Sequence, residues 1–356
     1  MNLENSRILY ISLTNTAGGA EQILLMCSKI TGGPVIFLKK TSRSPLSIGE
    51  SAQVRFLSRR SIFIGSLLLI KELIPFRRNY LILSSHPYLN AYLGILKRLG
   101  FLRSQLVTRE CTSVFLRFSG IKRFTYKFVY TLGYSAIDLL ICQTPEMKAQ
   151  LLQNIQFLKD DQVKVLKNPI DLPSIISHSE QEELDPIMNE RFICSAGRLI
   201  SLKGFDNLIS VFWEISKLDP DLKLLILGEG EQRHNLQQII ERLGLYDKVV
   251  LKGFVSNPFP YFKKAQVCVV SSIREGFPNV LLQMMALNQS VVSTLCADGI
   301  EEFNFIKKVA VGDLDGLKDA IISEIKLLKQ STTNKNFDLL MDRSPRAFLN
   351  QILRSI

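Results

Sequence analysis

One polar segment in the second half of the chain combines residue types that could bind a charged ligand. The sequence SSIREGFPNVLLQMMA spans Ser271–Ala286 and follows the apolar run Val267–Val270, which predicts a buried strand. Pro278 suits a first helical turn, so we expect a helix that starts at or just before it. The predicted apolar face of that helix comprises Val280, Leu281, Met284 and Met285. Glu275 would then stand directly ahead of a helix start.

That strand-to-helix junction could bind a nucleotide-sugar. The backbone N–H groups of a first helical turn lack acceptors within the helix and lie at its positive dipole end, where a diphosphate can bind. The carboxylate of Glu275 would repel a bare phosphate but can accept hydrogen bonds from sugar hydroxyls. The alternative is a plain connection between a strand and a helix.

Two cations follow another predicted strand, Phe192–Ala196, in the sequence GRLISLKGF. Arg198 can contact a phosphate through two N–H groups and Lys203 can act as a point charge. In a glycosyl transfer they would stabilise the departing nucleoside diphosphate without a bound metal. The alternative is a pair of solvated surface cations.

The first half of the chain carries three further candidates. Gly18 and Gly19 lie after the first predicted strand, where they would let the backbone approach a ligand closely. His86 ends the fourth strand and could bond a sugar hydroxyl or a phosphate oxygen, with helix capping or a core role as the alternative. Glu110 ends the next strand and could orient or deprotonate an acceptor hydroxyl. No G-x-G-x-x-G spacing accompanies these residues, which disfavours a nicotinamide dinucleotide.

The elements that must position these residues alternate between short apolar strands and helical segments. This order predicts an α/β fold with two doubly wound, Rossmann-like parallel sheets that face each other across a cleft. We expect an acceptor-binding domain over residues 1–170, a donor-binding domain over 171–344 and a last helix over 345–356 that could pack back on the first domain. Twelve strands are predicted: 7–13, 35–38, 54–57, 80–84, 105–108, 139–142, 163–166, 192–196, 222–227, 249–251, 267–271 and 290–293.

The net charge of +11 is unevenly distributed over the 356 residues. Residues 1–170 carry 23 Lys and Arg against 9 Asp and Glu, and the remainder carries 21 against 24. No nucleic-acid-binding module is recognisable, so an anionic membrane surface is the favoured partner of the basic half. The alternative is solvated charge around core helices. The basic and apolar residues that suggest a membrane are Arg59, Arg60, the run Ile62–Ile74, Arg77 and Arg78, and then Phe115, Arg117, Phe118, Lys122, Arg123, Phe124, Tyr126, Lys127 and Phe128.

The six cysteines are scattered, with no C-x-x-C pair, so neither a structural metal nor a disulfide is expected. No apolar stretch is long enough for a membrane-spanning helix, and the first residues predict a strand and not a signal peptide. We therefore expect a cytoplasmic chain, associated peripherally with the inner face of a membrane.

Taken together, these motifs resemble those of the retaining two-domain (GT-B) glycosyltransferases of family 4, also called group 1. The resemblance covers essentially the whole chain. It is carried by Gly18–Glu21, the hinge Asn168–Asp171, GRLISLKGFDNLI, LLILGEGEQRHNL, LKGFV and SSIREGFPNVLLQMMA, and by Gly299 with Glu302.

The resemblance implies a role for each matching residue. Arg198 and Lys203 would bind the donor diphosphate, and Glu275 would contact the transferred sugar. Further implied donor contacts are the segment Phe277, Pro278, Asn279 and Val280 at the phosphates, Phe254 and Val255 at the nucleobase, Gly18 and Gly19 from the first domain, and His86 at the sugar. No obligatory metal or other cofactor is implied, and the anomeric configuration is retained.

One position departs from the family pattern of two glutamates eight residues apart. Gln283 stands where the second glutamate is expected. Two helical turns, about 12 Å, would place it near the ribose hydroxyls while Glu275 serves the hexose. Glutamine keeps an acceptor oxygen but loses the charge, at a cost of about 1 kcal/mol in a buried site. Weaker donor affinity or an altered nucleotide contact is the expected consequence.

The predicted function is transfer of one sugar from a nucleoside-diphosphate-sugar to a lipid-linked glycan acceptor in cell-surface polysaccharide synthesis. A soluble acceptor is the enzymatic alternative. A catalytically inactive GT-B protein that binds nucleotide-sugars is the alternative from another class, for which Gln283 is the only sequence argument.

Overall fold

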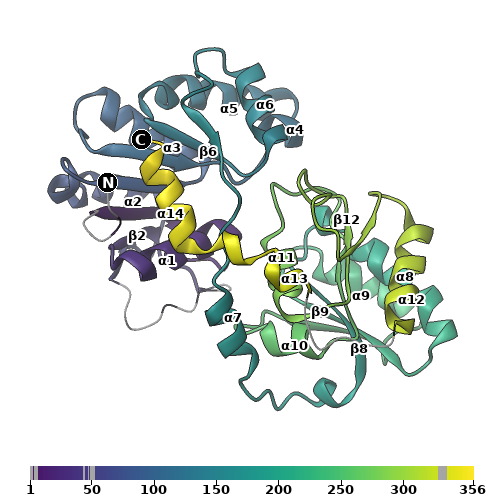
Figure 1. Cartoon of the computed structure of the whole chain (residues 1–356). Coiled ribbons are helices and arrows are strands. Elements are labelled where there is room, and N and C mark those ends of the chain that lie inside the picture. Colours follow the sequence, from purple (N-terminus) through teal and green to yellow (C-terminus); the bar gives the residue numbers. More distant parts are fainter. Residues whose placement is uncertain (1–2, 4–6, 43–44, 47, 49–52, 328–334) are drawn as a thin grey trace. The chain divides into compact units, whose positions relative to one another are not determined.

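The computed structural model of the chain describes residues 3, 7–42, 45–46, 48, 53–327 and 335–356. Its contacts divide the chain into two units (Figure 1). The first unit comprises Met1–Pro169 and Arg343–Ile356, and the second comprises Ile170–Asp342. Each unit is an α/β domain built around one parallel sheet.

The sheet of the first unit has seven strands in the order β3-β2-β1-β4-β5-β6-β7. All pairings are parallel, for example Ile11 with Ile36 and Ile11 with Ser84. The order reverses direction between β1 and β4, which is the place where doubly wound sheets leave a crevice at the carboxyl ends of their strands. The strands are β1 Ile8–Thr14, β2 Val35–Lys39, β3 Val54–Ser58, β4 Leu81–Ser85, β5 Gln105–Arg109, β6 Leu139–Cys142 and β7 Val163–Val165.

Helices cover both faces of this first sheet. On one face, apolar side chains of α2, α3 and α5 pack with Leu9, Ile36 and Leu106 in one buried cluster. On the other face, α1 and α14 pack with Tyr10 and Leu83. The helices of the unit are α1 Gly19–Thr31, α2 Ile62–Glu72, α3 Pro87–Arg98, α4 Val114–Arg117, α5 Gly120–Gly133, α6 Pro145–Asn154 and α14 Pro345–Arg354, with short 3-10 turns η2 Ile74–Phe76 and η3 Tyr134–Ala136.

The second unit repeats the plan with six parallel strands in the order β10-β9-β8-β11-β12-β13. Its strand order reverses between β8 and β11. The strands are β8 Arg191–Ala196, β9 Leu222–Leu227, β10 Val249–Gly253, β11 Val267–Val270, β12 Val291–Thr294 and β13 Lys307–Val309. The helices are α7 Leu172–Ser179, α8 Phe205–Leu218, α9 Arg233–Arg242, α10 Phe259–Lys264, α11 Asn279–Leu287, α12 Leu314–Lys326 and α13 Lys335–Asp338, with 3-10 turns η4 Pro186–Asn189, η5 Ser201–Lys203 and η6 Met341–Arg343.

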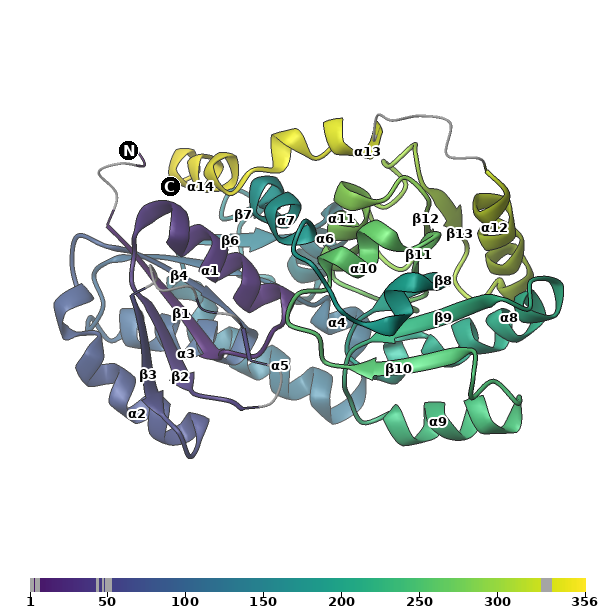
Figure 2. The ribbon, with the colours of Figure 1, turned by 90° about the horizontal axis from the view of Figure 1, so that it is seen from below.

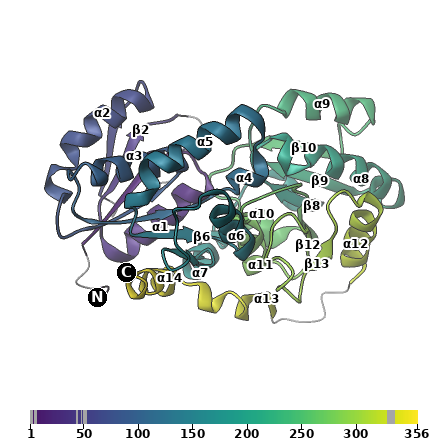
Figure 3. The ribbon, with the colours of Figure 1, turned by 90° about the horizontal axis from the view of Figure 1, so that it is seen from above.

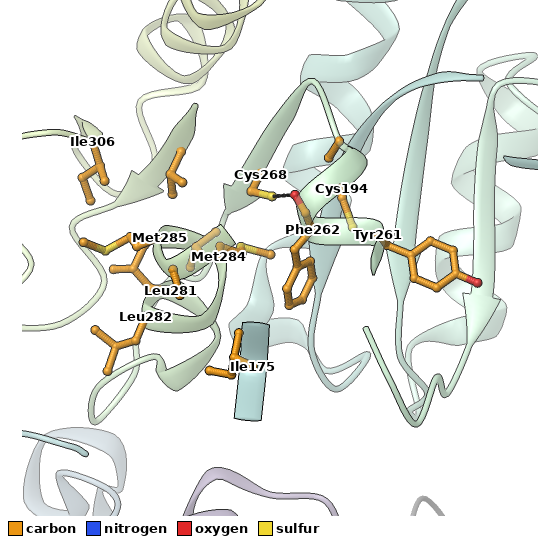
Figure 4. Close-up of a cluster of buried hydrophobic side chains, with 14 of the residues drawn as sticks. Ile175, Cys194, Tyr261, Phe262, Cys268, Leu281, Leu282, Met284, Met285 and Ile306 are labelled. Atoms are coloured by element: carbon orange, nitrogen blue, oxygen red, sulfur yellow. Dashed lines mark hydrogen bonds between the residues drawn. The ribbon is translucent and has the colours of Figure 1, made fainter. Parts of the chain in front are cut away.

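Buried side chains fix α11 against its sheet. Leu281, Met284 and Met285 point into a cluster that includes Phe262 of α10 and Ile175 of α7 (Figure 4). The thiol of Cys268 on β11 donates to the carbonyl oxygen of Phe262 at 3.4 Å, which ties α10 to the central strand. The helix that follows the Glu275 loop is therefore held rigidly, since packed cores resist displacement.

The predicted fold is confirmed as two Rossmann-like, doubly wound parallel-sheet domains. All twelve predicted strands are present, with ends that differ by at most two residues. The sequence prediction missed β13, whose three residues are Lys307, Lys308 and Val309, because two exposed lysines give no apolar signal. That the two domains face each other across a cleft stays a prediction.

Candidate functional site

The central feature of the second unit is an ion pair at the point where its strand order reverses. Lys203 lies on the loop after β8, and Glu275 lies on the loop after β11. The ammonium of Lys203 donates to Oε1 of Glu275, which also accepts from the hydroxyl of Ser272 at 2.8 Å. The two charged side chains are 15% and 18% exposed. The structure thus brings together two residues that the sequence analysis had predicted as ligand contacts, although they are 72 positions apart.

Backbone contacts hold these two loops against each other. Ile273 donates its N–H to the carbonyl oxygen of Leu202 at 2.8 Å, and the hydroxyl of Ser271 donates to the carbonyl oxygen of Lys203 at 3.0 Å. Gly204 has a φ of +61°, and a Cβ there would overlap the carbonyl oxygen of Ser271. Only glycine fits this position, because it tolerates both the left-handed backbone and the close approach.

The loop that carries Glu275 is also anchored to the end of β12 and to the residues that follow it. The backbone N–H of Glu275 donates to the carbonyl oxygen of Cys296 at 2.8 Å, and the hydroxyl of Thr294 donates to the carbonyl oxygen of Ser272 at 2.6 Å. Burial, and secondarily the nearby charge of Glu275, raise the pKa of the Cys296 thiol to about 12. Cys296 therefore stays protonated and is not a nucleophile at neutral pH.

The start of α11 lies just after Glu275. The helix begins at Asn279, with Pro278 as its N-cap residue, one position later than the sequence indicates. Pro278 has an extended backbone, with φ of −79° and ψ of 98°, and its own side chain forms no capping hydrogen bond. The N–H groups of a first turn have no acceptor within their helix, so the positive dipole end beyond Glu275 can bind an anion.

The remaining donor-site candidates of the second half of the chain all lie in the second unit. Arg198 is exposed on the loop that carries Lys203. Phe277 packs edge-on against Phe303, with 6.3 Å between the ring centroids. The other positions are Val280 and Gln283, half-buried on α11; Phe254, 38% exposed after β10; Val255, packed on the core; and Glu302, exposed.

A second polar group lies where the strand order of the first unit reverses. Nε2 of His86, after β4, is 2.6 Å from Oε1 of Glu21, which is buried in the first turn of α1. His86 has a φ of +92°, which is uncommon for a residue other than glycine and costs energy. His86 precedes α3 without capping it by its side chain. The structure thus leaves the imidazole oriented by a buried carboxylate.

Glu21 is a site residue to which the sequence analysis assigned no role. It lies in the Gly-Gly-Ala-Glu segment, and its Oε1 also accepts from Ser12 at 3.4 Å. A Cβ at Gly18 would lie 2.5 Å from Oε2 of Glu21, so this glycine leaves room for the carboxylate. Gly19 begins α1. The sequence signal that could have identified Glu21 is a carboxylate in the first helical turn after two glycines.

Glu110, predicted as an acceptor base, is buried in the first unit with 1% of its surface exposed. One carboxylate oxygen accepts from the hydroxyl of Tyr130 at 2.7 Å, and the other accepts from that of Tyr134 at 2.6 Å. Both oxygens thus serve the packing of α5 against the sheet. Burial raises the pKa of Glu110, and the two tyrosine hydroxyls lower it to a smaller extent.

The raised pKa of Glu110 predicts a pH-dependent contribution to stability. A carboxyl group whose pKa is higher in the folded than in the unfolded state stabilises the fold below its unfolded pKa, about 4.3, and loses that contribution as the pH rises. We expect the Tm of the wild type minus that of Glu110→Gln to decrease between pH 5 and pH 8. Glu214→Gln, on the surface of α8, is the control and should show no such trend. A Glu110→Gln difference that is constant with pH would contradict this assignment.

The hinge segment Asn168–Asp171 is fixed by one polar residue in each unit. The guanidinium of Arg109, 1% exposed, donates to Oδ1 of Asn168, and Nδ2 of Asn168 donates to Gln143 at 3.0 Å. In the second unit, Oδ1 of Asp171 accepts from the N–H of Ser174 at 3.2 Å and caps α7. The segment thus ends the first unit and starts the second.

Comparison with known proteins shows which family part of the chain resembles. Residues 177–329, within the second unit, match the family model for glycosyl transferases group 1. A Campylobacter jejuni protein named N-acetylgalactosamine-N,N'-diacetylbacillosaminyl-diphospho-undecaprenol 4-alpha-N-acetylgalactosaminyltransferase is 34% identical over 59% of this chain and 56% of its own. The lipopolysaccharide core biosynthesis glycosyltransferase LpsE of Rhizobium meliloti is 29% identical over 52% and 53%. The chain spans about half the length of these curated relatives.

Solved structures match the fold over nearly the whole chain. Anabaena Alr3699/HepE in complex with UDP-glucose has a TM-score of 0.77 at 19% identity and covers 98% of both chains. The trehalose-6-phosphate synthase OtsA has a TM-score of 0.78 at 16% identity, again over 98% of both. The loops of Lys203 and Glu275 both fall within the matched segment. The second unit of this chain is therefore similar to the glycosyl transferases group 1 family over residues 177–329, and the whole chain shares the GT-B-type fold of these structures.

Proposed function

We propose that this protein is a retaining glycosyltransferase of family 4 that moves one sugar from a nucleoside-diphosphate-sugar to a lipid-linked glycan in bacterial surface polysaccharide synthesis. The observation that carries the proposal is the Lys203–Glu275 pair. Both residues lie at carboxyl strand ends where the sheet order reverses, which is the usual ligand position in such sheets. The start of α11, with Pro278 as its N-cap residue, follows directly after Glu275 in the chain.

The proposed donor contacts follow from charge. Lys203 and Arg198 bind the diphosphate, and the first turn of α11, with Phe277, Pro278, Asn279 and Val280, contacts the same phosphates. Glu275 accepts hydrogen bonds from the hydroxyls of the transferred sugar. Before the donor binds, Lys203 and Glu275 compensate each other's charge. The bound donor then supplies a new partner for each, the diphosphate for Lys203 and the sugar hydroxyls for Glu275. Phe254 and Val255 contact the nucleobase, and Gln283 contacts the ribose.

The reaction breaks the bond between the anomeric carbon and the diphosphate oxygen. The acceptor hydroxyl oxygen bonds the same face of that carbon, and its proton passes to the departing diphosphate. Negative charge develops on the departing diphosphate, and fixed cations stabilise it more than they stabilise the bound donor. Lys203 and Arg198 supply that stabilisation without an obligatory metal. We propose that His86, oriented by Glu21, bonds the sugar, and that Gly18 and Gly19 admit the donor closely.

The lipid-linked acceptor is proposed on two grounds. The Campylobacter relative is named for a sugar carried on diphospho-undecaprenol, and the Rhizobium relative is named for lipopolysaccharide core synthesis. The basic first half, with 23 Lys and Arg among residues 1–170, provides charge of the sign that a lipid diphosphate requires. A peripheral position at a cytoplasmic membrane surface follows from such an acceptor.

A donor screen tests the proposal. Thermal unfolding is measured with UDP-, GDP- and ADP-sugars, because a ligand that binds only the folded state stabilises it by RT ln(1 + [L]/Kd). We expect one base to raise the Tm and the same donor to release its nucleoside diphosphate on incubation. Binding without turnover, with or without glycolipid acceptors, would indicate an inactive nucleotide-sugar-binding protein. Absence of both would contradict the proposal.

A further inference from the structure

The outer surface of α2 is unusually apolar for an exposed helix. Gly65 and Leu69 are its buried residues. Phe63 is 72% exposed and Leu67 is 56% exposed. The other exposed apolar residues of this segment are Ile62, Ile64, Leu68, Ile70 and Ile74. A soluble surface rarely leaves such a contiguous apolar patch uncovered unless it binds something.

The outer surface of α5 combines an apolar stripe with positive charge. Ile121 is 83% exposed and Phe124 is 71% exposed, and Phe128 and Leu132 continue the same face at helical spacing. Lys122, Arg123 and Lys127 lie on the same helix, and its sequence, GIKRFTYKFVYTLG, contains no acidic residue. This pattern is typical of helices that lie in the interface of an anionic membrane.

Both helices belong to one layer on one face of the first sheet. Apolar side chains of α2, α3 and α5 share a single buried cluster with the sheet. The hydroxyl of Tyr92 on α3 donates to the carbonyl oxygen of Ser66 on α2 at 2.8 Å. On the other side of α3, a Cβ at Gly94 would overlap the carbonyl oxygen of Gly133 on α5. The helices α2 and α5 thus flank α3 on one face of the first sheet, as Figures 2 and 3 show.

The charges indicate what covers this face. A two-fold interface with a second copy would bring the cations of α5 against their own copies, with no carboxylate on that helix to compensate them. An anionic lipid surface instead compensates them, because its headgroups carry the opposite charge. The α2 segment has arginines at both ends, Arg59 and Arg60 before it and Arg77 and Arg78 after it. Within the described residues, no helix is long and apolar enough to cross a bilayer.

We propose that the outer faces of α2 and α5 together dock on an anionic membrane, with α2 inserting apolar side chains between the lipids and α5 binding both acyl chains and headgroups. This inference names the membrane-facing surface for the proposed lipid-linked acceptor, and in that respect it rests on the proposed function. The surface itself is independent of the Lys203–Glu275 site, because the two lie in different units.

Vesicle flotation with the full chain tests the inference. The variants are Phe63→Gln with Leu67→Gln on α2, Phe124→Gln with Phe128→Gln on α5, and Lys122→Gln with Lys127→Gln for charge. We expect the wild type to float with vesicles of phosphatidylglycerol and phosphatidylcholine. Each apolar double variant should bind about tenfold more weakly, as expected from lost apolar burial. The charge variant should bind about tenfold more weakly and lose much of its salt dependence.

Leu184→Gln with Leu218→Gln is the matched control, since these residues are 86% and 72% exposed in the second unit. It should bind vesicles as the wild type does. The inference would be overturned if the α2 and α5 variants bound vesicles as strongly as the wild type. It would also be overturned if the control lost as much binding as these variants do. A dimer that only these variants dissociate would assign the face to a second copy. Donor hydrolysis by the wild type, measured without vesicles, separates the two claims. If the wild type hydrolyses the donor but does not float with vesicles, the docking surface is wrong. If it floats but does not hydrolyse the donor, the enzymatic proposal is wrong.

Discussion

Replacing Glu275 by glutamine is expected to lower kcat for sugar transfer by about 10²- to 10³-fold, the range seen when one preorganised electrostatic group is lost from an active site. The carboxylate accepts hydrogen bonds roughly twice as strong as those of a neutral amide. It also positions the ammonium of Lys203. The donor KM should change less, because the variant keeps the cations that bind the ground-state diphosphate.

Steady-state kinetics with the donor identified by the thermal screen measures this effect. Glu214→Gln is the control, because Glu214 forms a surface ion pair with Lys217 at 3.0 Å, with about half of each side chain exposed. The control should retain full activity. Retention of more than half of the wild-type kcat by Glu275→Gln, with an unchanged Tm, would remove Glu275 from the catalytic residues.

Lys203→Ala is expected to reduce kcat/KM by about 10³-fold or more, because two effects add. The change removes a cation from the departing diphosphate, and it leaves the Glu275 carboxylate uncompensated beside that diphosphate. The donor KM should therefore rise as well as kcat fall. Lys263→Ala, which removes an exposed partner of Glu180, is the matched control and should behave as the wild type.

The double variant Lys203→Ala, Glu275→Ala separates these two effects. If the uncompensated carboxylate repels the diphosphate, donor binding by the double variant should be tighter than that by Lys203→Ala alone. Donor affinity that is equal in wild type and Lys203→Ala would show that Lys203 does not contact the phosphates.

The strands were predictable because most of them are short runs of buried apolar residues between helical segments. Leu222–Leu227 is an example in which the predicted and observed bounds agree, since its burial requires an apolar sequence. The strand β13 could not be found in this way, because a sheet edge tolerates exposed lysines. Pro278 was placed in the helix and instead lies directly before its first residue, Asn279, a difference of one residue that propensity does not resolve.

The candidate site was predictable in its components and not in its connections. Charged residues after strands, such as Lys203 and Glu275, could be expected at the carboxyl edge of a sheet. That these two form an ion pair depends on the strand order, which places β8 beside β11. The pairing of Glu21 with His86 depends in the same way on β1 lying beside β4. Sequence alone does not fix that order.

Glu110 illustrates the opposite case. Its position after a strand resembles that of Glu275, so the sequence gives both the same apparent potential. The difference lies in Tyr130 and Tyr134, which reach the Glu110 carboxylate from 20 and 24 residues away and occupy both of its oxygens. Burial by such distant side chains decides whether a carboxylate is available to a ligand.

The most direct test of the central claim is a crystal structure of the full chain with a nucleoside-diphosphate-sugar that raises its Tm. The account predicts that Nζ of Lys203 lies within hydrogen-bond distance of a diphosphate oxygen, that Glu275 accepts from a sugar hydroxyl, and that the first turn of α11 contacts the phosphates. A diphosphate bound elsewhere, with the Lys203–Glu275 ion pair intact, would contradict it.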